Sequence, residues 1–306
     1  MNEFVIYTVR TGGYDDILQP KVVDNRFDYV LFTDHTDAST IGIWQVKTIP
    51  YFHADSIRMS RYPKMHPNEL LKEYKASLYI DANIQILQQR LYDRIIELYD
   101  QQIDWAGAAH PCHRDCIYDE IYAIYGLDYE KTLMRWGHRL RKENFPRHQG
   151  LYENNIIFRR HNQITKAIND LWWQTYDAYS RRDQLSLFYA FWKIPGAKKT
   201  LLLSEGENAR NSDALKVFNH LSIAKSANRR EVKVSFFEHA RNRCRHGLSE
   251  KEASFRAFHY WLYGLPPFIA NLLLYIWGMY SLIVYGPTIK YRAYKRHKRI
   301  KNTATS

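Results

Sequence analysis

Short apolar runs alternate with amphipathic stretches along the first 195 residues of the chain. Runs rich in β-branched and aromatic residues, each bounded by turn-forming or polar residues, are typical of buried strands. These runs are Phe4–Val9, Phe27–Phe32, Ile43–Ile49, Ser77–Ile80, Trp105–Ala109 and Glu153–Arg159. The stretches with helical periodicity are Pro67–Tyr74, Gln89–Gln101, Ile164–Tyr179 and Asp183–Trp192. Strands that alternate with helices predict an α/β domain with a mostly parallel central sheet flanked by helices.

The residues that follow these strands are the first candidates for a ligand site, because ligands of open α/β sheets bind beyond the carboxyl ends of the strands. They are polar here: residues 8–13, Asp34, residues 81–83 and His110. The chain has neither the Gly-x-Gly-x-x-Gly pattern nor the Gly-x-x-x-x-Gly-Lys-Ser/Thr pattern. This argues against a dinucleotide-binding fold and against a P-loop kinase or ATPase.

The sharpest local motif is LYIDANIQI, residues 78–86, in which an apolar strand ends in Asp81-Ala82-Asn83. Positions i and i+2 of an extended chain point the same way, so Asp81 and Asn83 can offer oxygens to one hard cation. Mg²⁺ or Mn²⁺ bound in this way is commonly completed by a diphosphate, whose charge it neutralises. A strand-end turn is the more common meaning of Asp and Asn at such a place, and it remains the alternative.

Charge divides the chain into two regions. Residues 225–306 hold 16 Lys/Arg and 4 Asp/Glu, which accounts for the whole net charge of +12, whereas residues 1–224 are neutral. We therefore predict a globular domain over residues 1–224 and a basic, membrane-associating region over residues 225–306. Three cysteines exclude a disulfide framework and fit a reducing compartment. The aromatic fraction of 15% suits sugar-stacking surfaces or a membrane interface.

The C-terminal region contains an apolar stretch followed by a basic run. Residues 260–289 carry no charge, and residues 290–301 hold seven Lys/Arg and no acid. We expect Phe268–Tyr285 to lie on the cytoplasmic face of an anionic membrane, since basic residues flank it on both sides. A buried core helix and a true membrane span are the alternatives. Nucleic-acid binding is disfavoured, and the N-terminus has no signal-peptide pattern, so the domain is expected in the cytoplasm.

Several segments, taken in order, resemble a known family. They are YTVRTGGYDD, KMHPNELL, YIDANIQI, AHPCHRDCIYDE, GLYENNIIFRRHN and RRDQLSLFYAFWK, over about residues 3–195. The set resembles the hexosyltransferase-like family of plant proteins of seed mucilage and pollen-tube turgor. The resemblance implies a single A-type glycosyltransferase domain that binds a nucleotide diphosphate sugar and transfers a hexose. Asn83 stands where such enzymes more commonly have the second Asp of a D-x-D motif, which puts metal dependence in question.

The resemblance also suggests roles for individual residues. Glu153 and Asp183 are equally ranked candidates for the catalytic base. The alternatives are a solvent-exposed acid at the start of a strand for Glu153 and a helix cap for Asp183. Asp81 and Asn83 are the candidate ligands of Mn²⁺ or Mg²⁺. The candidate donor-binding residues are Thr8, Arg10, Asp34, Arg58, Arg61, Lys64, His110, Arg114, Asn154 and Gln184.

The predicted function is therefore hexosyl transfer from a nucleotide diphosphate sugar to a polysaccharide or lipid-linked acceptor. Two other functions remain open: a non-catalytic, membrane-bound nucleotide-sugar-binding protein and a metal-dependent phosphohydrolase. An inverting enzyme needs a base opposite the departing diphosphate and a retaining enzyme does not, so the sequence leaves the stereochemistry open.

Overall fold

The computed structural model describes residues 2–13, 15–124, 128–219, 252–277, 279–280 and 283 of the chain. Its strands are β1 (Phe4–Arg10), β2 (Phe27–Thr33), β3 (Thr40–Ile41), β4 (Trp44–Thr48), β5 (Ala76–Ile80), β6 (Ile84–Ile86), β7 (Trp105–Ala109), β8 (Tyr152–Arg160), β9 (Lys199–Leu201) and β10 (Leu215–Val217). Its labelled helices are α1 (Ser56–Met65), α2 (Pro67–Leu70), α3 (Arg90–Asp100), α4 (Ile117–Ala123), α5 (Glu130–Lys142), α6 (Gln163–Ala178), α7 (Gln184–Lys193) and α9 (Glu252–Leu262).

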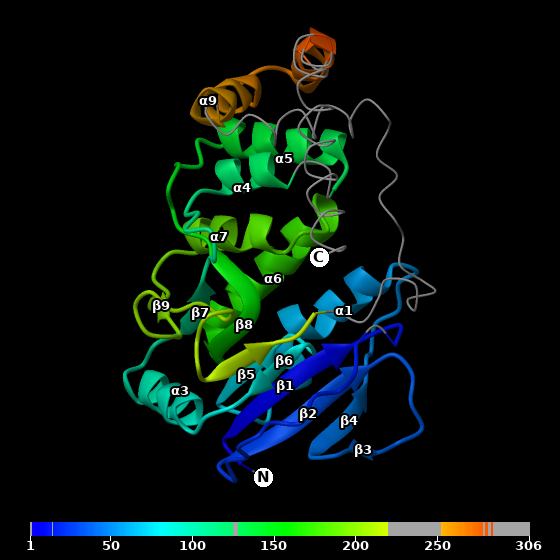
Figure 1. The fold of residues 1–306 in the computed structure, drawn as a ribbon, viewed down its shortest axis with the longest axis vertical. Helices are drawn as coiled ribbons and strands as arrows, with labels where there is room; N and C mark the ends of the chain where they lie inside the picture. Colours follow the sequence, from blue (N-terminus) through cyan, green and yellow to red (C-terminus); the bar gives the residue numbers. More distant parts are fainter. Residues whose placement is uncertain are drawn as a thin grey trace, which may run out of the picture. The chain divides into compact units, whose positions relative to one another are not determined.

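The central sheet of the described residues has eight strands in the order β3-β4-β2-β1-β5-β8-β7-β9 (Figure 1). β1 pairs in parallel with β2 and β5, β2 with β4, and β7 with β9. β8 runs antiparallel to both of its neighbours, β5 and β7, and β3 runs antiparallel to β4. The predicted α/β class with a mostly parallel sheet is therefore confirmed, with β8 as the reversed strand in its middle.

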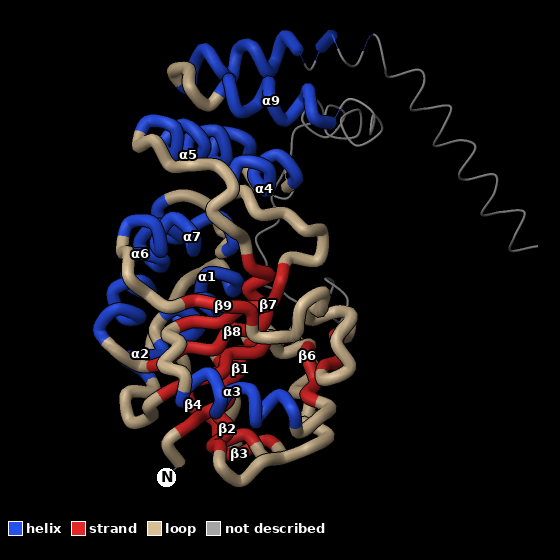
Figure 2. Tube along the Cα trace, turned by 90° about the vertical axis from the view of Figure 1, so that its left-hand side faces the viewer, coloured by secondary structure: helices blue, strands red, loops and turns tan. Residues whose placement is uncertain are grey.

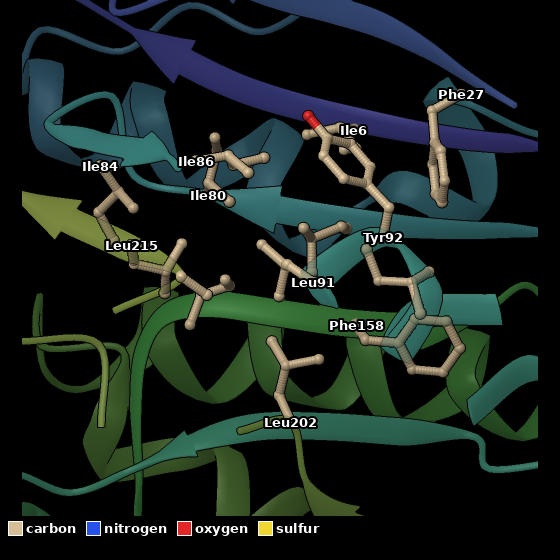
Figure 3. Close-up of a cluster of buried hydrophobic side chains, with 14 of the residues drawn as sticks. Ile6, Phe27, Ile80, Ile84, Ile86, Leu91, Tyr92, Phe158, Leu202 and Leu215 are labelled. Atoms are coloured by element: carbon tan, nitrogen blue, oxygen red, sulfur yellow. The ribbon is translucent and has the colours of Figure 1, made fainter. Parts of the chain in front are cut away.

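A hydrophobic core lies between one face of the sheet and α3. Ile6, Leu78 and Phe158 of the sheet are fully buried in one cluster with Leu91 and Ile95 of α3, and Figure 3 shows part of this cluster. Successive residues of a strand point to opposite faces. Tyr7 and Arg159, the chain neighbours of Ile6 and Phe158, accordingly contact α1 and α6 on the other face of the sheet.

Each of the six predicted strands and four predicted helices overlaps an element of the structure. The predicted helix Pro67–Tyr74 is shorter than expected: α2 ends at Leu70, and turns follow it. The strands that the pattern missed, β3, β6, β9 and β10, are two or three residues long. β9 extends the sheet beside β7, and β10 pairs with β6 in a second, two-stranded sheet. The segment after α7 therefore returns to the body of the domain.

The chain divides into two compact units: residues 1–117 with 147–231, and residues 118–146 with 232–306. Residues 118–146, which lie inside the predicted domain 1–224, thus group with C-terminal residues. The labelled elements of this second unit, α4, α5 and α9, are all helices, as Figure 2 shows. Within it α5 lies close to Tyr263, the residue that follows α9, because a Cβ added at Gly137 would lie 2.6 Å from Cδ1 of Tyr263.

The end of the described chain is helical as well. Residues 267–277, 279–280 and 283 are in helical conformation after the turn at residues 263–266. A search of the described residues finds no helix with the length and apolarity needed to cross a membrane. The predicted segment Phe268–Tyr285 is described only in part, and the basic run 290–301 lies outside the described residues.

Candidate active site

The polar strand ends meet at one edge of the sheet. The parallel strands β1, β2 and β5 end there, and the reversed strand β8 begins there. The backbone N–H of Asp81 donates to the carbonyl of Asn155 (2.8 Å), and Ala108 pairs with Glu153. Residues that follow β5 and β7 therefore lie beside the first residues of β8, although as many as 74 positions separate Asp81 from Asn155 in the sequence.

A buried cluster of charged side chains occupies this edge; we call Arg61, Lys64, Tyr79, Asp81 and Asp183 the Lys64 cluster. Nζ of Lys64 lies 2.6 Å from Oδ2 of Asp183 and 3.8 Å from Oδ1 of Asp81, and the Lys64 side chain is only 2% exposed. Nε of Arg61 lies 3.1 Å from the same oxygen of Asp183. The hydroxyl of Tyr79 donates to Oδ1 of Asp81 (2.6 Å).

Helix α1 brings two cations to the cluster. Asp55 caps the helix, since its side chain accepts from the backbone N–H of Ile57, and the hydroxyl of Tyr7 donates to the carbonyl of Lys64 in the last turn (3.2 Å). Arg61 and Lys64 are three residues apart and so share one face of the helix. This face is turned towards Asp183, the residue that precedes α7.

The charges of the cluster determine the protonation state of Asp183. Burial by itself would raise the pKa of this carboxyl group, but the charges of Lys64 and Arg61 outweigh burial and lower the pKa to about 2. Asp183 is therefore ionised at neutral pH and binds protons very weakly. This geometry fits an anchor for two cations, and it argues against Asp183 as a general base in this conformation. Burial and the carboxylate of Asp81 raise the pKa of Tyr79, which stays a hydrogen-bond donor.

The first residues of β8 supply a second carboxylate and two amides. Oε1 of Glu153 accepts from Nη2 (2.6 Å) and Nε (3.1 Å) of Arg210. Oε2 of Glu153, both amide atoms of Asn154 and Oδ1 of Asn155 are buried and have no hydrogen-bond partner among the described residues. A buried polar atom without a partner costs about 1–3 kcal/mol. A ligand with hydroxyl groups would satisfy several of these atoms at once.

Asp81 and Asn83 are the predicted cation ligands. The carboxylate of Asp81 is 28% exposed, and its Oδ1 already accepts from Tyr79. The amide nitrogen of Asn83 donates to the carbonyl of Phe218 (2.7 Å), which fixes the orientation of this side chain. Within the described residues no group of three or more His, Cys, Asp or Glu side chains could hold a metal. The two side chains thus fit a cation held by one or two protein oxygens and completed by phosphate, rather than a preformed metal centre.

A pocket of about 510 Å³ lies beyond the ends of β2 and β4, lined by residues that include Asp34, Tyr51, Phe52, His53 and Ser56. Oδ2 of Asp34 accepts a hydrogen bond from the backbone N–H of Gly12 (2.8 Å), in the turn that follows β1. The ring of Tyr51 stacks between those of His53 and Tyr62, at centroid distances of 6.3 and 4.7 Å. A pocket lined by aromatic rings and one carboxylate has the chemistry needed to bind a nucleoside.

The structure brings together some of the predicted residues and separates others. Arg61, Lys64, Asp81 and Asp183 meet in the Lys64 cluster. Arg58 instead pairs with Asp177 of α6. Asp34 lines the pocket. The others lie as follows: Thr8 is buried in β1, Arg10 ends β1, His110 is buried after β7 with its ring accepting from the N–H of Cys112, Arg114 is half-buried, and Gln184 begins α7.

Three contributors escaped the sequence analysis. Tyr79 stands two positions before Asp81 on the same strand, and strand alternation alone predicts that the two share one face. Asn155 directly follows Glu153 and Asn154, which are predicted site residues. Its place beside Asp81, however, depends on the reversed direction of β8. Arg210 belongs to a stretch without periodicity, and no local signal links it to Glu153.

Comparison with models of protein families gives a match over most of the chain. The family model described as TOD1/MUCI70, glycosyltransferase-like domain, matches residues 18–220. This range, about two thirds of the chain, includes the Lys64 cluster, the pocket, Glu153 and Arg210, and it leaves out the C-terminal residues from 221 onwards. No curated protein matches the chain by sequence.

Proposed function

The chain belongs to the TOD1/MUCI70 glycosyltransferase-like family, and from this premise we propose that it transfers a hexose from a nucleotide diphosphate sugar to a hydroxyl of a glycan or lipid-linked acceptor. The observation that carries the proposal is the Lys64 cluster. A buried lysine, a partly exposed arginine and a partly exposed carboxylate stand at the carboxyl edge of the sheet, where α/β proteins bind their ligands.

Helix α1 connects the pocket to the Lys64 cluster and so sets the distance between them. Ser56 and Met59, in the first half of the helix, line the pocket, and Lys64 lies in its last turn. At 1.5 Å per residue the rise from Ser56 to Lys64 is about 12 Å. A nucleoside in the pocket would thus place its diphosphate towards Arg61 and Lys64. Asp34 would accept hydrogen bonds from the nucleoside, and Tyr51 and His53, which line the pocket, would border it.

The cations would act on the departing diphosphate. When the bond between the anomeric carbon and the diphosphate oxygen breaks, negative charge grows on the leaving group. Preorganised positive charge in a buried site stabilises such a transition state. Lys64 and Arg61 supply two positive charges here, and Asp183 holds both in place. A Mg²⁺ or Mn²⁺ ion held by Asp81 and Asn83 would add further neutralisation of the diphosphate.

Glu153 is the better placed of the two candidate bases. Its Oε2 is buried and without a hydrogen-bond partner in the described structure. Asp183, by contrast, forms ion pairs with both Lys64 and Arg61. In an inverting route Glu153 would take the proton of the acceptor hydroxyl, whose oxygen would form the new bond to the anomeric carbon as the nucleoside diphosphate leaves. Oε2 would take this proton, while Arg210 keeps its hydrogen bonds to Oε1.

The test is a thermal-shift and turnover screen of the purified full-length chain with nucleotide sugars, with and without Mn²⁺. A ligand at one hundred times its Kd adds about 2.7 kcal/mol of stability. We expect one class of donor to raise the melting temperature and to be converted to free nucleoside diphosphate when an acceptor is present. Stabilisation without turnover over a broad acceptor panel would instead support a non-catalytic nucleotide-sugar-binding protein. Release of inorganic phosphate would support a phosphohydrolase.

A further inference from the structure

An exposed apolar surface lies on the last helical stretch that the structure describes. Phe268, Leu272, Ile276 and Ile283 are 73%, 57%, 54% and 73% exposed. We call these four residues the apolar stripe, and we propose that the stripe rests on the surface of an anionic lipid bilayer. Soluble surfaces rarely present large apolar side chains side by side, and such patches mark interaction sites.

Three of the four residues share one side of the helix over residues 267–277. At 3.6 residues per turn, positions 268, 272 and 276 fall within an arc of about 80°. Ala270 and Leu274, on another side, are each only 1% exposed. The helix is therefore apolar on two sides for different reasons: one side packs within the protein, and the other is presented outwards. A helix that keeps one side against protein suits a position in the membrane interface, with its axis along the surface.

The same unit also presents an exposed aromatic residue. Trp261, near the end of α9, is 53% exposed, and its ring stacks on that of Phe258 at 6.1 Å. Tryptophan is enriched at the level of lipid headgroups, where its ring is partly in apolar and partly in polar surroundings. α9 is anchored within its own unit, because Nη1 of Arg141 donates to the hydroxyl of Tyr260 (2.6 Å). The exposed side chains are thus carried by an ordered helical support.

The charge of the chain selects a lipid surface over other partners. No charged residue occurs from position 260 to 289, and seven Lys/Arg without an acid follow in positions 290–301. Lys and Arg next to a membrane-bound segment attract anionic headgroups, each by about 1 kcal/mol near the surface. A second copy of the chain on the stripe would instead bring together two chains that each carry a net charge of +12, and like charges disfavour that arrangement.

Vesicle flotation of the full-length chain tests the proposal. Vesicles of phosphatidylcholine alone are compared with vesicles in which phosphatidylserine replaces part of it. We expect strong binding to the anionic vesicles, weakened by salt, and little binding to the neutral ones. The double variant Leu272→Gln with Ile276→Gln should bind anionic vesicles at least tenfold more weakly. Because both side chains are exposed, the variant should keep its circular dichroism and its melting temperature.

A matched control separates the stripe from general surface hydrophobicity. Val23 is 53% exposed in the other unit, so Val23→Gln makes a similar change outside the stripe. It should bind vesicles like the unaltered chain. Unchanged vesicle binding of the stripe variant, or equal binding to neutral and anionic vesicles, would overturn the proposal. So would a sedimentation experiment in which the stripe variant converts a dimer to a monomer, because the stripe would then be covered by a second copy.

Discussion

Nζ of Lys64 lies 2.6 Å from Oδ2 of Asp183, with the two side chains 2% and 10% exposed. The two residues are 119 positions apart and come from the end of α1 and the start of α7. Removal of Lys64 leaves the buried carboxylate of Asp183 with Arg61 as its remaining cation, and loss of a partner inside a buried pair is far more costly than loss of a surface pair.

Lys64→Met should therefore lower the free energy of unfolding by about 3–5 kcal/mol. The double variant Lys64→Met with Asp183→Leu should recover part of this loss, since no charge of the pair then remains buried. Urea denaturation measures both values. Arg58→Met is the control, because Arg58 pairs with the half-exposed Asp177 and such pairs contribute about 0–1 kcal/mol. Equal losses in Lys64→Met and Arg58→Met would contradict the assignment.

His161 predicts a loss of stability in mild acid. Burial lowers its pKa from 6.5 to about 4, and its Nε2 lies 2.8 Å from the hydroxyl oxygen of Ser77. Below pH 6.5 the unfolded chain binds a proton that the folded chain does not. The contribution of His161 is thus complete above pH 6.5 and declines as the pH falls towards 4, by about 3 kcal/mol in total. His161→Gln should flatten this part of the stability curve. Parallel curves for the two proteins between pH 7 and pH 4 would refute the prediction.

Glu153→Gln should reduce hexosyl transfer by about 10²-fold or more while donor binding is retained, because the amide keeps the shape and cannot accept the proton. Donor affinity from calorimetry and the rate of nucleoside diphosphate release check the two parts. Glu207→Gln is a suitable control, since Glu207 is an acid of the neighbouring loop that pairs with Arg90. Full activity of Glu153→Gln would favour a retaining route without a protein base.

Asp81→Ala should lower transfer by at least about 10²-fold, because the departing diphosphate loses a cation ligand. Any response of the rate to added Mn²⁺ should disappear with it. Asp93→Ala removes a carboxylate of α3 that is 58% exposed and pairs with Arg26, so it should leave both the rate and the Mn²⁺ response unchanged. A folded Asp81→Ala protein with unaltered turnover would sink the assignment of Asp81 as a cation ligand.

Gly137→Ala should destabilise the helical unit by about 1–3 kcal/mol, since the added methyl group would overlap the ring of Tyr263. Thermal unfolding followed by tryptophan fluorescence and by hydrogen exchange in α5 measures the effect. The double variant Gly137→Ala with Tyr263→Leu, which makes room for the methyl group, should lose less than the two single changes together. Strict additivity would show that the contact is not a close one.

The sequence allowed prediction of those parts of the fold that local patterns encode. Long apolar runs identified β1, β2, β5, β7 and β8, but strands of two or three residues, such as β9, have no measurable periodicity. The reversal of β8 depends on its pairing with β5 and β7, which no local pattern records.

The candidate site shows the same division between local and tertiary information. Lys64, Asp81 and Asp183 could be nominated one by one, yet their contact, which alters the expected role of Asp183, is a tertiary fact. The absence of Arg58 from the Lys64 cluster could have been predicted. At 100° per residue it lies about 120° around α1 from Lys64, so the two cannot share one face.

The reversed strand also affects which segment of the chain can change in length without disturbing the sheet. Ala109, the last residue of β7, pairs with Tyr152, the first residue of β8, so the chain between them leaves the sheet and returns to it at neighbouring points. Closing a longer loop between two fixed ends costs only about 0.6 kcal/mol for each doubling of its length. A change in length between residues 121 and 149, outside the segment AHPCHRDCIYDE, would therefore put little strain on the sheet, and its cost would fall on α4 and α5.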